Sequence, residues 1–152
     1  RSTLFPYTTL FRSIARMLEL GVKPYLLASS LLGVLAQRLV RKICDNCRYE
    51  VYLSESELEA LELKVNEGER LKAWKGDGCV SCRSTGYKGR TGIFELLIVE
   101  ERIRRMINEN FDSKELFKVA RQEGMMTLKE AAVKKLARGV TDFDEIIRVL
   151  SY

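Results

Sequence analysis

The sequence predicts an α+β fold that is mainly helical and carries a small tetracysteine unit with short strands. Three observations support this fold class. Apolar residues recur at three- and four-residue intervals near the start of the chain and over 100–150, as on one face of a helix. Two runs, RLVRKIC at 38–44 and RTGIFELLIV at 90–99, have the composition of strands. The only four cysteines form two Cys-x-x-Cys pairs between these helical parts.

The elements before the first cysteine are expected to be helices followed by a strand. A helix that starts at Ile14 ends at Gly21, a suitable C-terminal cap, and Pro24 suits the first turn of the next helix. Residues 28–37 form a largely apolar run and are expected to be a buried helix. The strand at 38–44 then leads into the first cysteine pair.

The segment between the cysteine pairs is expected to be structured. Ser54 and Glu57 have the spacing of a capping box, which predicts a short helix after Ser54. The only tryptophan, Trp74, lies in the run LKAWK, which predicts a brief strand. After the second pair, the strand at 90–99 follows a glycine-rich bend.

The remainder of the chain predicts helices that pack as one compact cluster. Their apolar residues fall at helical spacing, and their ends carry capping residues and glycines. The expected helices cover 100–110, a segment capped by Ser113 and closed by Gly124, a segment capped by Thr127 and closed by Gly139, and a last helix from Thr141 or Asp142 to Leu150. Acidic residues of this region, Glu123, Asp142, Asp144 and Glu145, are expected to be capping and surface residues.

The two cysteine pairs predict a four-thiolate zinc site made of Cys44, Cys47, Cys79 and Cys82. Each two-residue spacer allows a tight knuckle that directs both sulfurs at one ion. Disulfides, a redox-active pair or buried free thiols are weaker alternatives, because nothing indicates secretion and neither pair lies near a βαβ pattern. Four thiolates leave no position for a reactive water, so the zinc is expected to be structural. The chain has no histidine, which excludes a mixed Cys/His site and every His-containing triad.

Segment 1–13 is expected to be foreign to the protein. Its residues 3–13, TLFPYTTLFRS, resemble the translation of a sequencing-library adapter. The segment holds two of the 26 basic residues and none of the 21 acidic ones, so the net charge of +5 falls to +3 without it. A secretory signal is a weaker alternative, because Pro6 interrupts the apolar run. The longest later apolar stretch, 25–36, is shorter than the roughly 20 residues of a membrane span. We therefore expect a native reading frame cut near residue 14.

A basic group surrounds the cysteine pairs, and it has two interpretations. The first is a solvated surface; the second is a site for an acidic or phosphorylated partner, since arginine binds such groups through two hydrogen bonds. The group consists of Arg38, Arg41, Arg83, Lys88 and Arg90. The glycines near the cysteines do not form a phosphate loop, because the pattern G-x-x-x-x-G-K-[ST] is absent from the sequence. The small net charge does not favour nucleic-acid binding.

Three segments resemble the C-terminal portion of the type II secretion and type IV pilus assembly ATPases, the secretion ATPase E family. They are LGVLAQRLVRKICDNC, GCVSCRSTGYKGRTGIFELL and GMMTLKEAAVKKLARGVTDFDEIIRV, in that order. The resemblance covers 14–150. It implies that 14–43 is the C-terminal end of a RecA-like ATPase core, 44–90 the tetracysteine zinc unit, and 91–152 a strand plus a helical tail.

The resemblance also implies residue roles and partners. Cys44, Cys47, Cys79 and Cys82 match the zinc ligands by position, and Arg90 and, more weakly, Arg38 match a subunit interface. Family members are homohexamers on the cytoplasmic side of the bacterial inner membrane, where they work with secretion or pilus platform proteins. Their ATP and magnesium are bound by upstream motifs that this chain lacks. The fragment is therefore expected to have no catalytic residues, no transmembrane segment and no nucleic-acid partner, and not to hydrolyse ATP alone.

The rival hypothesis is a free-standing zinc-ribbon module that binds nucleic acid or a protein partner. It predicts exposed aromatic faces beside clustered basic residues, and a steep dependence of binding on salt. Tyr49, Tyr52, Trp74 and Tyr87 lie near the cysteine pairs in the sequence. The small net charge argues against this hypothesis.

Overall fold

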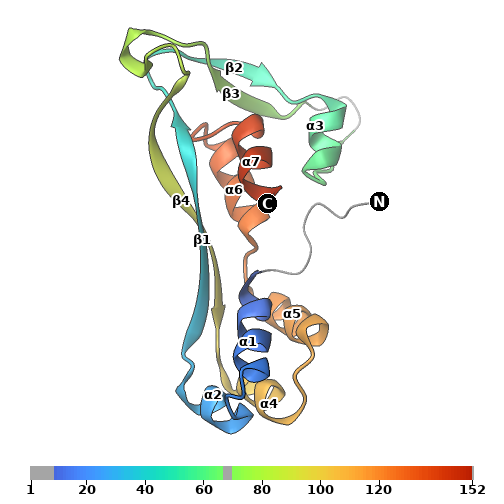
Figure 1. The fold of residues 1–152 in the computed structure, drawn as a ribbon. Helices are drawn as coiled ribbons and strands as arrows, with labels where there is room; N and C mark the ends of the chain where they lie inside the picture. Colours follow the sequence, from blue (N-terminus) through green and yellow to red (C-terminus); the bar gives the residue numbers. More distant parts are fainter. Residues whose placement is uncertain (1–8, 67–69, 152) are drawn as a thin grey trace. The chain divides into compact units, whose positions relative to one another are not determined.

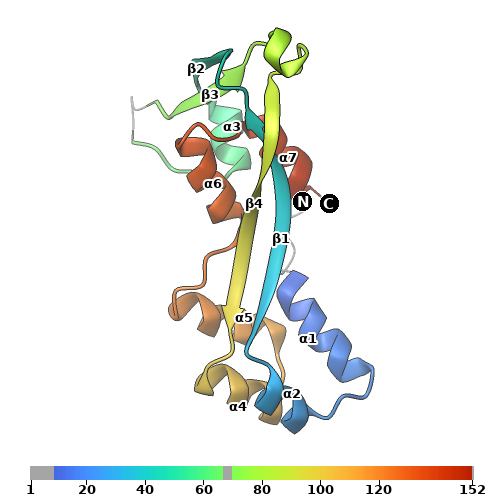
Figure 2. The same ribbon diagram turned by 90° about the vertical axis from the view of Figure 1, so that its left-hand side faces the viewer.

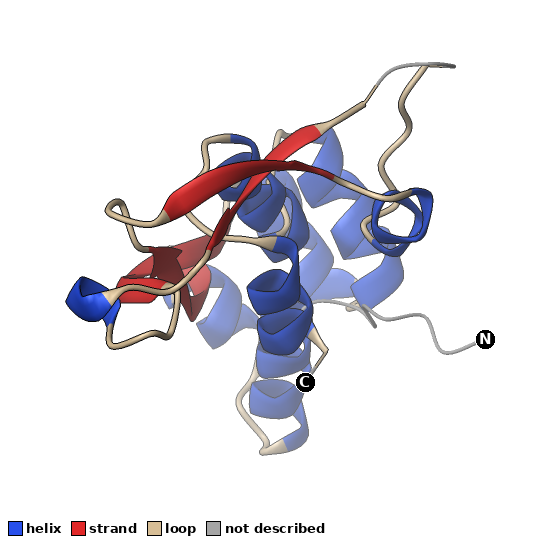
Figure 3. Cartoon of the chain, turned by 90° about the horizontal axis from the view of Figure 1, so that it is seen from above, coloured by secondary structure: helices blue, strands red, loops and turns tan. Residues whose placement is uncertain are grey.

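The computed structural model describes residues 9–66 and 70–151, and this part of the chain is α+β with seven helices and two small sheets (Figures 1 and 3). The helices are α1 (Thr9–Glu19), α2 (Pro24–Ser30), α3 (Glu55–Ala60), α4 (Glu101–Glu109), α5 (Ser113–Gln122), α6 (Leu128–Ala137) and α7 (Phe143–Leu150). The strands are β1 (Gly33–Ile43), β2 (Arg48–Tyr52), β3 (Lys72–Gly76) and β4 (Tyr87–Ile98), and a 3-10 turn, η1, spans Val80–Cys82.

Each sheet has two strands, β1 with β4 and β2 with β3. The long strands β1 and β4 run side by side in both views (Figures 1 and 2). They are antiparallel, because Val99 N donates to Leu32 O at one end and Cys44 N donates to Gly86 O at the other, each at 2.9 Å. The short pair β2 and β3 is also antiparallel. Hydrogen bonds of both sheets therefore join segments that are far apart in the sequence.

The described chain divides into two compact units, each with its own hydrophobic core. The first unit contains residues 9–37 and 94–127, and the second contains 38–93 and 128–151. Strands β1 and β4 contribute residues to both units. The boundary within β4 falls between Ile93 and Phe94.

The core of the first unit is built by α1, α2, α4 and α5, with α2 against α4 and α1 against α5. The ring of Phe11 meets that of Phe117 edge-on, with 5.9 Å between centroids. Its fully buried large side chains are Leu10, Phe11, Ile14, Leu97, Ile103, Ile107 and Leu116. The opposite side of β4 is apolar but exposed: Phe94 is 48% exposed, Leu96 47% and Ile98 56%.

The core of the second unit gathers around α6 and α7. In the β2–β3 pair, Val51 stands opposite Ala73, and both belong to this core. A Cβ atom on Gly139, between α6 and α7, would lie 2.5 Å from Trp74 Cδ1, so the indole packs directly on the glycine backbone. The fully buried large side chains are Leu61, Ile93, Leu136 and Ile146.

Several local expectations are confirmed. Ser54 caps α3 in a reciprocal capping box with Glu57. Asp142 caps α7 through a hydrogen bond from Glu145 N. The strands expected at 38–44, around Trp74 and at 90–99 are present as parts of β1, β3 and β4. Strand β2 is an element that the sequence patterns do not predict.

The buried helix expected over 28–37 is wrong. Helix α2 ends at Ser30, and β1 begins three residues later. Val34 and Ala36 pack against the core, whereas Leu35 between them is 56% exposed, which is the alternation of a strand. An apolar run of this length is compatible with either element, and here pairing with β4 decides for the strand.

Two expectations about the helices after residue 100 are also wrong. The cap of α5 is Asp112 and not Ser113, because Asp112 Oδ1 accepts from Lys114 N at 2.7 Å and Glu115 N at 3.3 Å. The four helices do not form one cluster: α4 and α5 belong to the first core, and α6 and α7 to the second. Amphipathic spacing shows that a helix has an apolar face but does not identify what that face contacts.

The segment 1–13 is only partly described, since residues 1–8 lie outside the described ranges. Residues 9–13 belong to α1, and Leu10 and Phe11 are buried in the first core. The foreign origin of this segment stays a prediction. Within the described ranges, no helix combines the length and the apolar character needed to cross a bilayer.

Candidate metal centre

The four cysteines converge at one place in the second unit, where all four Sγ atoms lie within 4.8 Å of one another. Three of the pairs are 3.7 to 3.9 Å apart: Cys44 to Cys79 at 3.9 Å, Cys47 to Cys82 at 3.8 Å, and Cys79 to Cys82 at 3.7 Å. A zinc ion that binds four thiolates tetrahedrally at about 2.3 Å places its sulfurs about 3.8 Å apart. The group therefore has the dimensions of a four-thiolate metal site.

The distances also exclude the disulfide alternative in this structure. A disulfide joins sulfurs at about 2.05 Å, and all four cysteines are free. Cys44 and Cys82 are buried, while Cys47 and Cys79 are half-buried. The cysteine side chains therefore meet as thiols around a common point.

Each pair forms a tight turn, as its two-residue spacer predicts. Cys47 N donates to Cys44 O at 3.3 Å, and Cys82 N donates to Cys79 O at 3.2 Å. Backbone amides also point at the sulfurs: Gly78 N donates to Cys47 Sγ at 3.3 Å, and Cys79 N donates to Cys82 Sγ at 3.1 Å. These amides stabilise negative charge on sulfur, which metal coordination requires.

A close contact of two backbones shapes the second knuckle. A Cβ atom on Gly76 would lie 2.1 Å from Gly86 O, and a Cβ atom on Gly86 would lie 2.6 Å from Gly76 O. Gly86 also has a φ of +76°, which favours glycine. Gly76 ends β3 just before Cys79, and Gly86 precedes β4, so these two glycines let the strands approach at the cysteine group.

The thiols differ in their tendency to ionise. Burial raises the pKa of the Cys47 thiol to about 12, and hydrogen bonds that this thiol donates to the neighbouring sulfurs add to the effect. Burial also opposes ionisation of Cys82, but hydrogen bonds from the backbone of Cys79 and Gly86 outweigh it and lower the pKa to about 6. Each thiolate disfavours the next one at this separation, so a cation is needed to hold four thiolates together.

The strands next to the cysteines are hydrogen-bonded to the segment that leads into α7. Ile43 N donates to Val140 O at 2.9 Å, directly before Cys44. Tyr87 Oη donates to Asp142 Oδ2 at 2.6 Å. Burial and this carboxylate raise the pKa of Tyr87, so the hydroxyl keeps its proton. These bonds connect the cysteine group to the start of the last helix.

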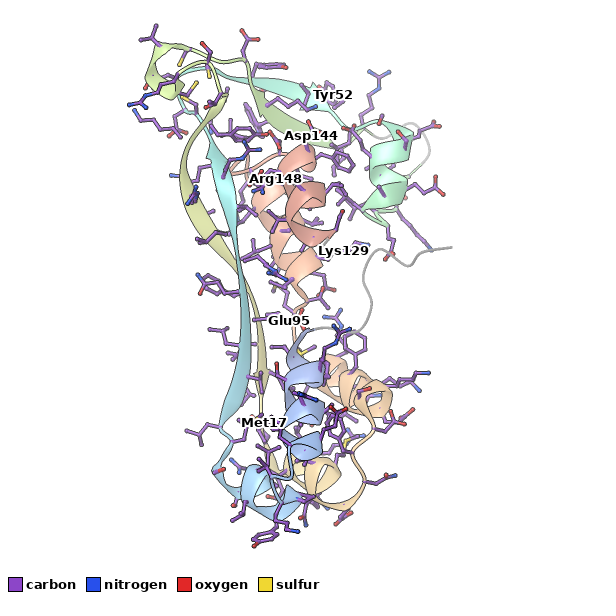
Figure 4. The ribbon with its side chains drawn as sticks, in the orientation of Figure 1. Met17, Tyr52, Glu95, Lys129, Asp144 and Arg148 are labelled. Carbon is purple, nitrogen blue, oxygen red and sulfur yellow. The ribbon has the colours of Figure 1, made fainter. Side chains whose placement is uncertain are left out.

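Glu145 is not a surface residue, and this corrects the sequence-based expectation. Its side chain is 0% exposed and accepts hydrogen bonds from Arg41 Nε at 2.8 Å and Arg148 Nε at 2.7 Å. Burial opposes its ionisation, but the two guanidinium groups outweigh burial and lower the pKa of Glu145 to about 2. Figure 4 labels Arg148 on α7. The sequence alone did not link Arg41 to residues more than 100 positions later.

The basic residues that the sequence groups around the cysteine pairs occupy different surroundings in the structure. Arg38 and Arg90 are both exposed, as a role at a subunit interface requires. Arg90 lines a surface hollow together with Arg41 and Arg148, and Arg38 is not among the residues that line it. Arg83 is exposed, and Lys88 donates to Ser81 Oγ at 2.9 Å. The basic group read from the sequence is therefore divided: Arg41 belongs to the Glu145 network, and the others lie at the surface.

Several aromatic faces near the cysteines are covered by cations of the same chain. Arg41 stacks on the Tyr87 ring at 3.9 Å, and Arg48 and Lys72 lie 4.8 and 5.0 Å from the centroid of Trp74. Stacking platforms for single-stranded nucleic acid need free aromatic faces. This arrangement does not favour the zinc-ribbon hypothesis.

Comparison with known proteins identifies a family. The family described as Type II/IV secretion system protein matches residues 2–148. This match begins within segment 1–13 and covers both compact units.

Curated relatives cover nearly the whole chain. The chain is 40% identical over 136 residues to "Type IV pilus assembly ATPase PilB" of Thermus thermophilus, a match that covers 90% of this chain and 15% of that protein. It is 39% identical over 137 residues to "Type II secretion system protein HxcR" of Pseudomonas aeruginosa, covering 90% and 25%. It is 36% identical over 148 residues to "Type II secretion system protein E" of Aeromonas hydrophila, covering 97% and 29%. The chain therefore spans less than a third of each of these relatives.

Proposed function

Because this chain belongs to the Type II/IV secretion system protein family, we propose that it is the C-terminal part of an ATPase that powers type II secretion or type IV pilus assembly. Both machines are supported by its relatives, which are named for type IV pilus assembly or for type II secretion. ATP hydrolysis with magnesium belongs to the whole protein in this proposal. The present chain contains no phosphate-binding loop of the Walker type and does not hydrolyse ATP by itself.

The cysteine group holds zinc in this proposal, with Cys44, Cys47, Cys79 and Cys82 as the four ligands. The observation that carries it is the set of sulfur separations, which match a tetrahedral thiolate site. The ion is structural, because it joins two cysteine turns that lie far apart in the sequence. The strand before the first turn is β1, and the strand before the second turn is β3. Four thiolates complete the coordination, so the ion activates no water.

The remaining parts of the proposal concern the whole assembly. Residues 14–43 end a RecA-like core, 44–90 form the zinc unit, and 91–152 add a strand and a helical tail. The exposed apolar side of β4 at Phe94, Leu96 and Ile98 supports this, because such a surface in a monomeric protein is ordinarily covered. The intact protein is a homohexamer on the cytoplasmic side of the inner membrane, in contact with platform proteins, with Arg90 and Arg38 at a subunit boundary.

Metal analysis of the purified chain tests the zinc proposal. We expect roughly one zinc per chain, and a strong chelator should change the fluorescence of Trp74, because β3 leads directly into the second knuckle. Cys82→Ser should remove the zinc, whereas Ser81→Ala in the same knuckle should retain it. Zinc well below one equivalent in the unaltered chain, or equal zinc in both variants, would contradict the proposal.

The genomic reading frame around this chain tests the ATPase proposal. We expect an upstream phosphate-binding loop, and a longer protein expressed from that frame should release phosphate from ATP while the present chain does not. A start codon immediately before Ile14 would contradict the proposal. So would a longer protein that binds zinc but shows no ATPase activity under conditions in which it is folded and hexameric.

A further inference from the structure

A hollow of about 380 Å³ in the second unit is lined by three arginines and one leucine: Leu39, Arg41, Arg90 and Arg148. Leu39 and Arg41 come from β1, Arg90 from β4 and Arg148 from α7. The three arginines are thus brought from separate parts of the chain to one concave place. The cysteine group and the zinc proposal do not account for this arrangement.

Two of the arginines are held in fixed positions. Both donate to the fully buried Glu145, Arg41 through Nε at 2.8 Å and Nη2 at 2.7 Å, and Arg148 through Nε at 2.7 Å and Nη2 at 2.6 Å. Arg41 is also stacked on the Tyr87 ring. Their side chains remain 40% and 52% exposed, so the carboxylate holds them from the buried side and leaves part of each accessible. Little side-chain freedom is lost when a ligand binds such groups.

The charge in the hollow is not balanced by the side chains that form it. The lining carries three positive charges, and Glu145 beneath it carries one negative charge. Arg90 is exposed, and its side chain makes no ion pair or hydrogen bond within the described ranges. Three arginines thus line a hollow in which one carboxylate holds two of them, and such a cluster suits a phosphate group, which accepts hydrogen bonds on several oxygens.

We propose that this hollow binds the phosphate group of a small molecule, with Arg41 and Arg148 as preorganised donors and Arg90 as the third. Guanidinium groups present paired N–H donors that fit phosphate oxygens. Leu39, which is 51% exposed, supplies an apolar wall beside the charged groups. The site needs neither the zinc ion nor a hexamer, so it can be present even if the proposed function fails.

Nuclear magnetic resonance of the arginine Nε–Hε groups tests the proposal on the intact chain. Pyrophosphate is titrated at constant ionic strength, with inorganic phosphate and ATP in parallel to identify which phosphate source binds best. We expect saturable shifts of the Arg41 and Arg148 signals. Arg90→Gln should weaken pyrophosphate binding about tenfold, as the loss of one charge-assisted contact worth about 1.4 kcal/mol predicts.

The matched control is Arg138→Gln, which removes an exposed positive charge elsewhere in the second unit. This variant should bind pyrophosphate like the unaltered chain. Equal weakening by both variants would show non-specific attraction and overturn the proposal. It would also be overturned if no phosphate compound shifts the two signals, or if they respond only to protein concentration, since a carboxylate of a second copy would then fill the hollow.

Discussion

Replacing Glu145 by glutamine tests whether the buried carboxylate stabilises the second unit. Glu145 is 0% exposed and is surrounded by donors of Arg41 and Arg148. Glutamine has nearly the same shape but no charge, and its amide group would place a donor against guanidinium donors. The variant therefore removes the charge while it preserves the packing.

The expected cost is about 2 to 3 kcal/mol of unfolding free energy. The pKa of Glu145 falls from 4.5 to about 2, and at about 1.4 kcal/mol per pKa unit this corresponds to about 3 kcal/mol. Arg41 and Arg148 are 40% and 52% exposed, so solvent screens part of the interaction. In other proteins, loss of one partner of a buried ion pair costs about 3 to 5 kcal/mol of unfolding free energy, which is an upper bound for Glu145→Gln.

The effect depends on pH with a definite sign. A carboxylate whose folded pKa is lowered contributes stability above its unfolded pKa, and this contribution is lost as the pH falls through the folded pKa. The advantage of the unaltered chain over Glu145→Gln should therefore be complete at pH 7 and decrease from about 4.5 towards 2. Only the difference between the two chains is interpreted, because acid also protonates the cysteine thiolates of both.

Urea unfolding followed by Trp74 fluorescence measures this difference, since Trp74 is the only tryptophan and lies in the second unit. Glu59→Gln, on the exposed side of α3, is the matched control and should change the unfolding free energy by less than about 0.5 kcal/mol. An equally small change for Glu145→Gln at pH 7 would refute the reasoning. So would a large difference that stays constant from pH 7 to pH 3.

Two further substitutions test the local structure of the second unit. Ser54→Ala removes the capping oxygen that Glu57 N contacts at 3.3 Å, and should cost about 1 kcal/mol in urea unfolding; an unchanged midpoint would contradict the capping role. Gly76→Ala places a Cβ atom 2.1 Å from Gly86 O, so the strands must separate; we expect a loss of about 2 kcal/mol or more together with a lower zinc content. Full stability and full zinc content in Gly76→Ala would show that the two backbones do not need to touch.

The candidate metal site was accessible from the sequence because its signal is local. Each Cys-x-x-Cys spacing directs two sulfurs to one side, and the structure brings both pairs together within 4.8 Å. The capping box of Ser54 and the cap of Asp142 were predictable for the same reason, since each depends on residues within three positions. The zinc itself, and the interface roles of Arg90 and Arg38, stay predictions.

The errors concern contacts between distant segments. The apolar run at 28–37 is compatible with a buried helix, because the strand that pairs with it cannot be identified from nearby residues. That strand, β4, lies more than 50 residues later. Strand β2 was missed because its five residues pair only with β3. Glu145 was placed at the surface because the arginine that it binds on β1 is 104 positions away.

The sequence by itself determined the grouping of the four cysteines, the caps of α3 and α7, and the family, because these depend on residue identity and short spacing. Only the tertiary structure decided which core each helix joins, that Glu145 is buried, and that Arg41, Arg90 and Arg148 share one hollow. Local spacing restricts the backbone within one or two turns, whereas burial and charge neutralisation depend on which distant segments are brought together. In this chain, the pairing of β1 with β4 and the packing of α7 in the second unit bring these distant segments together.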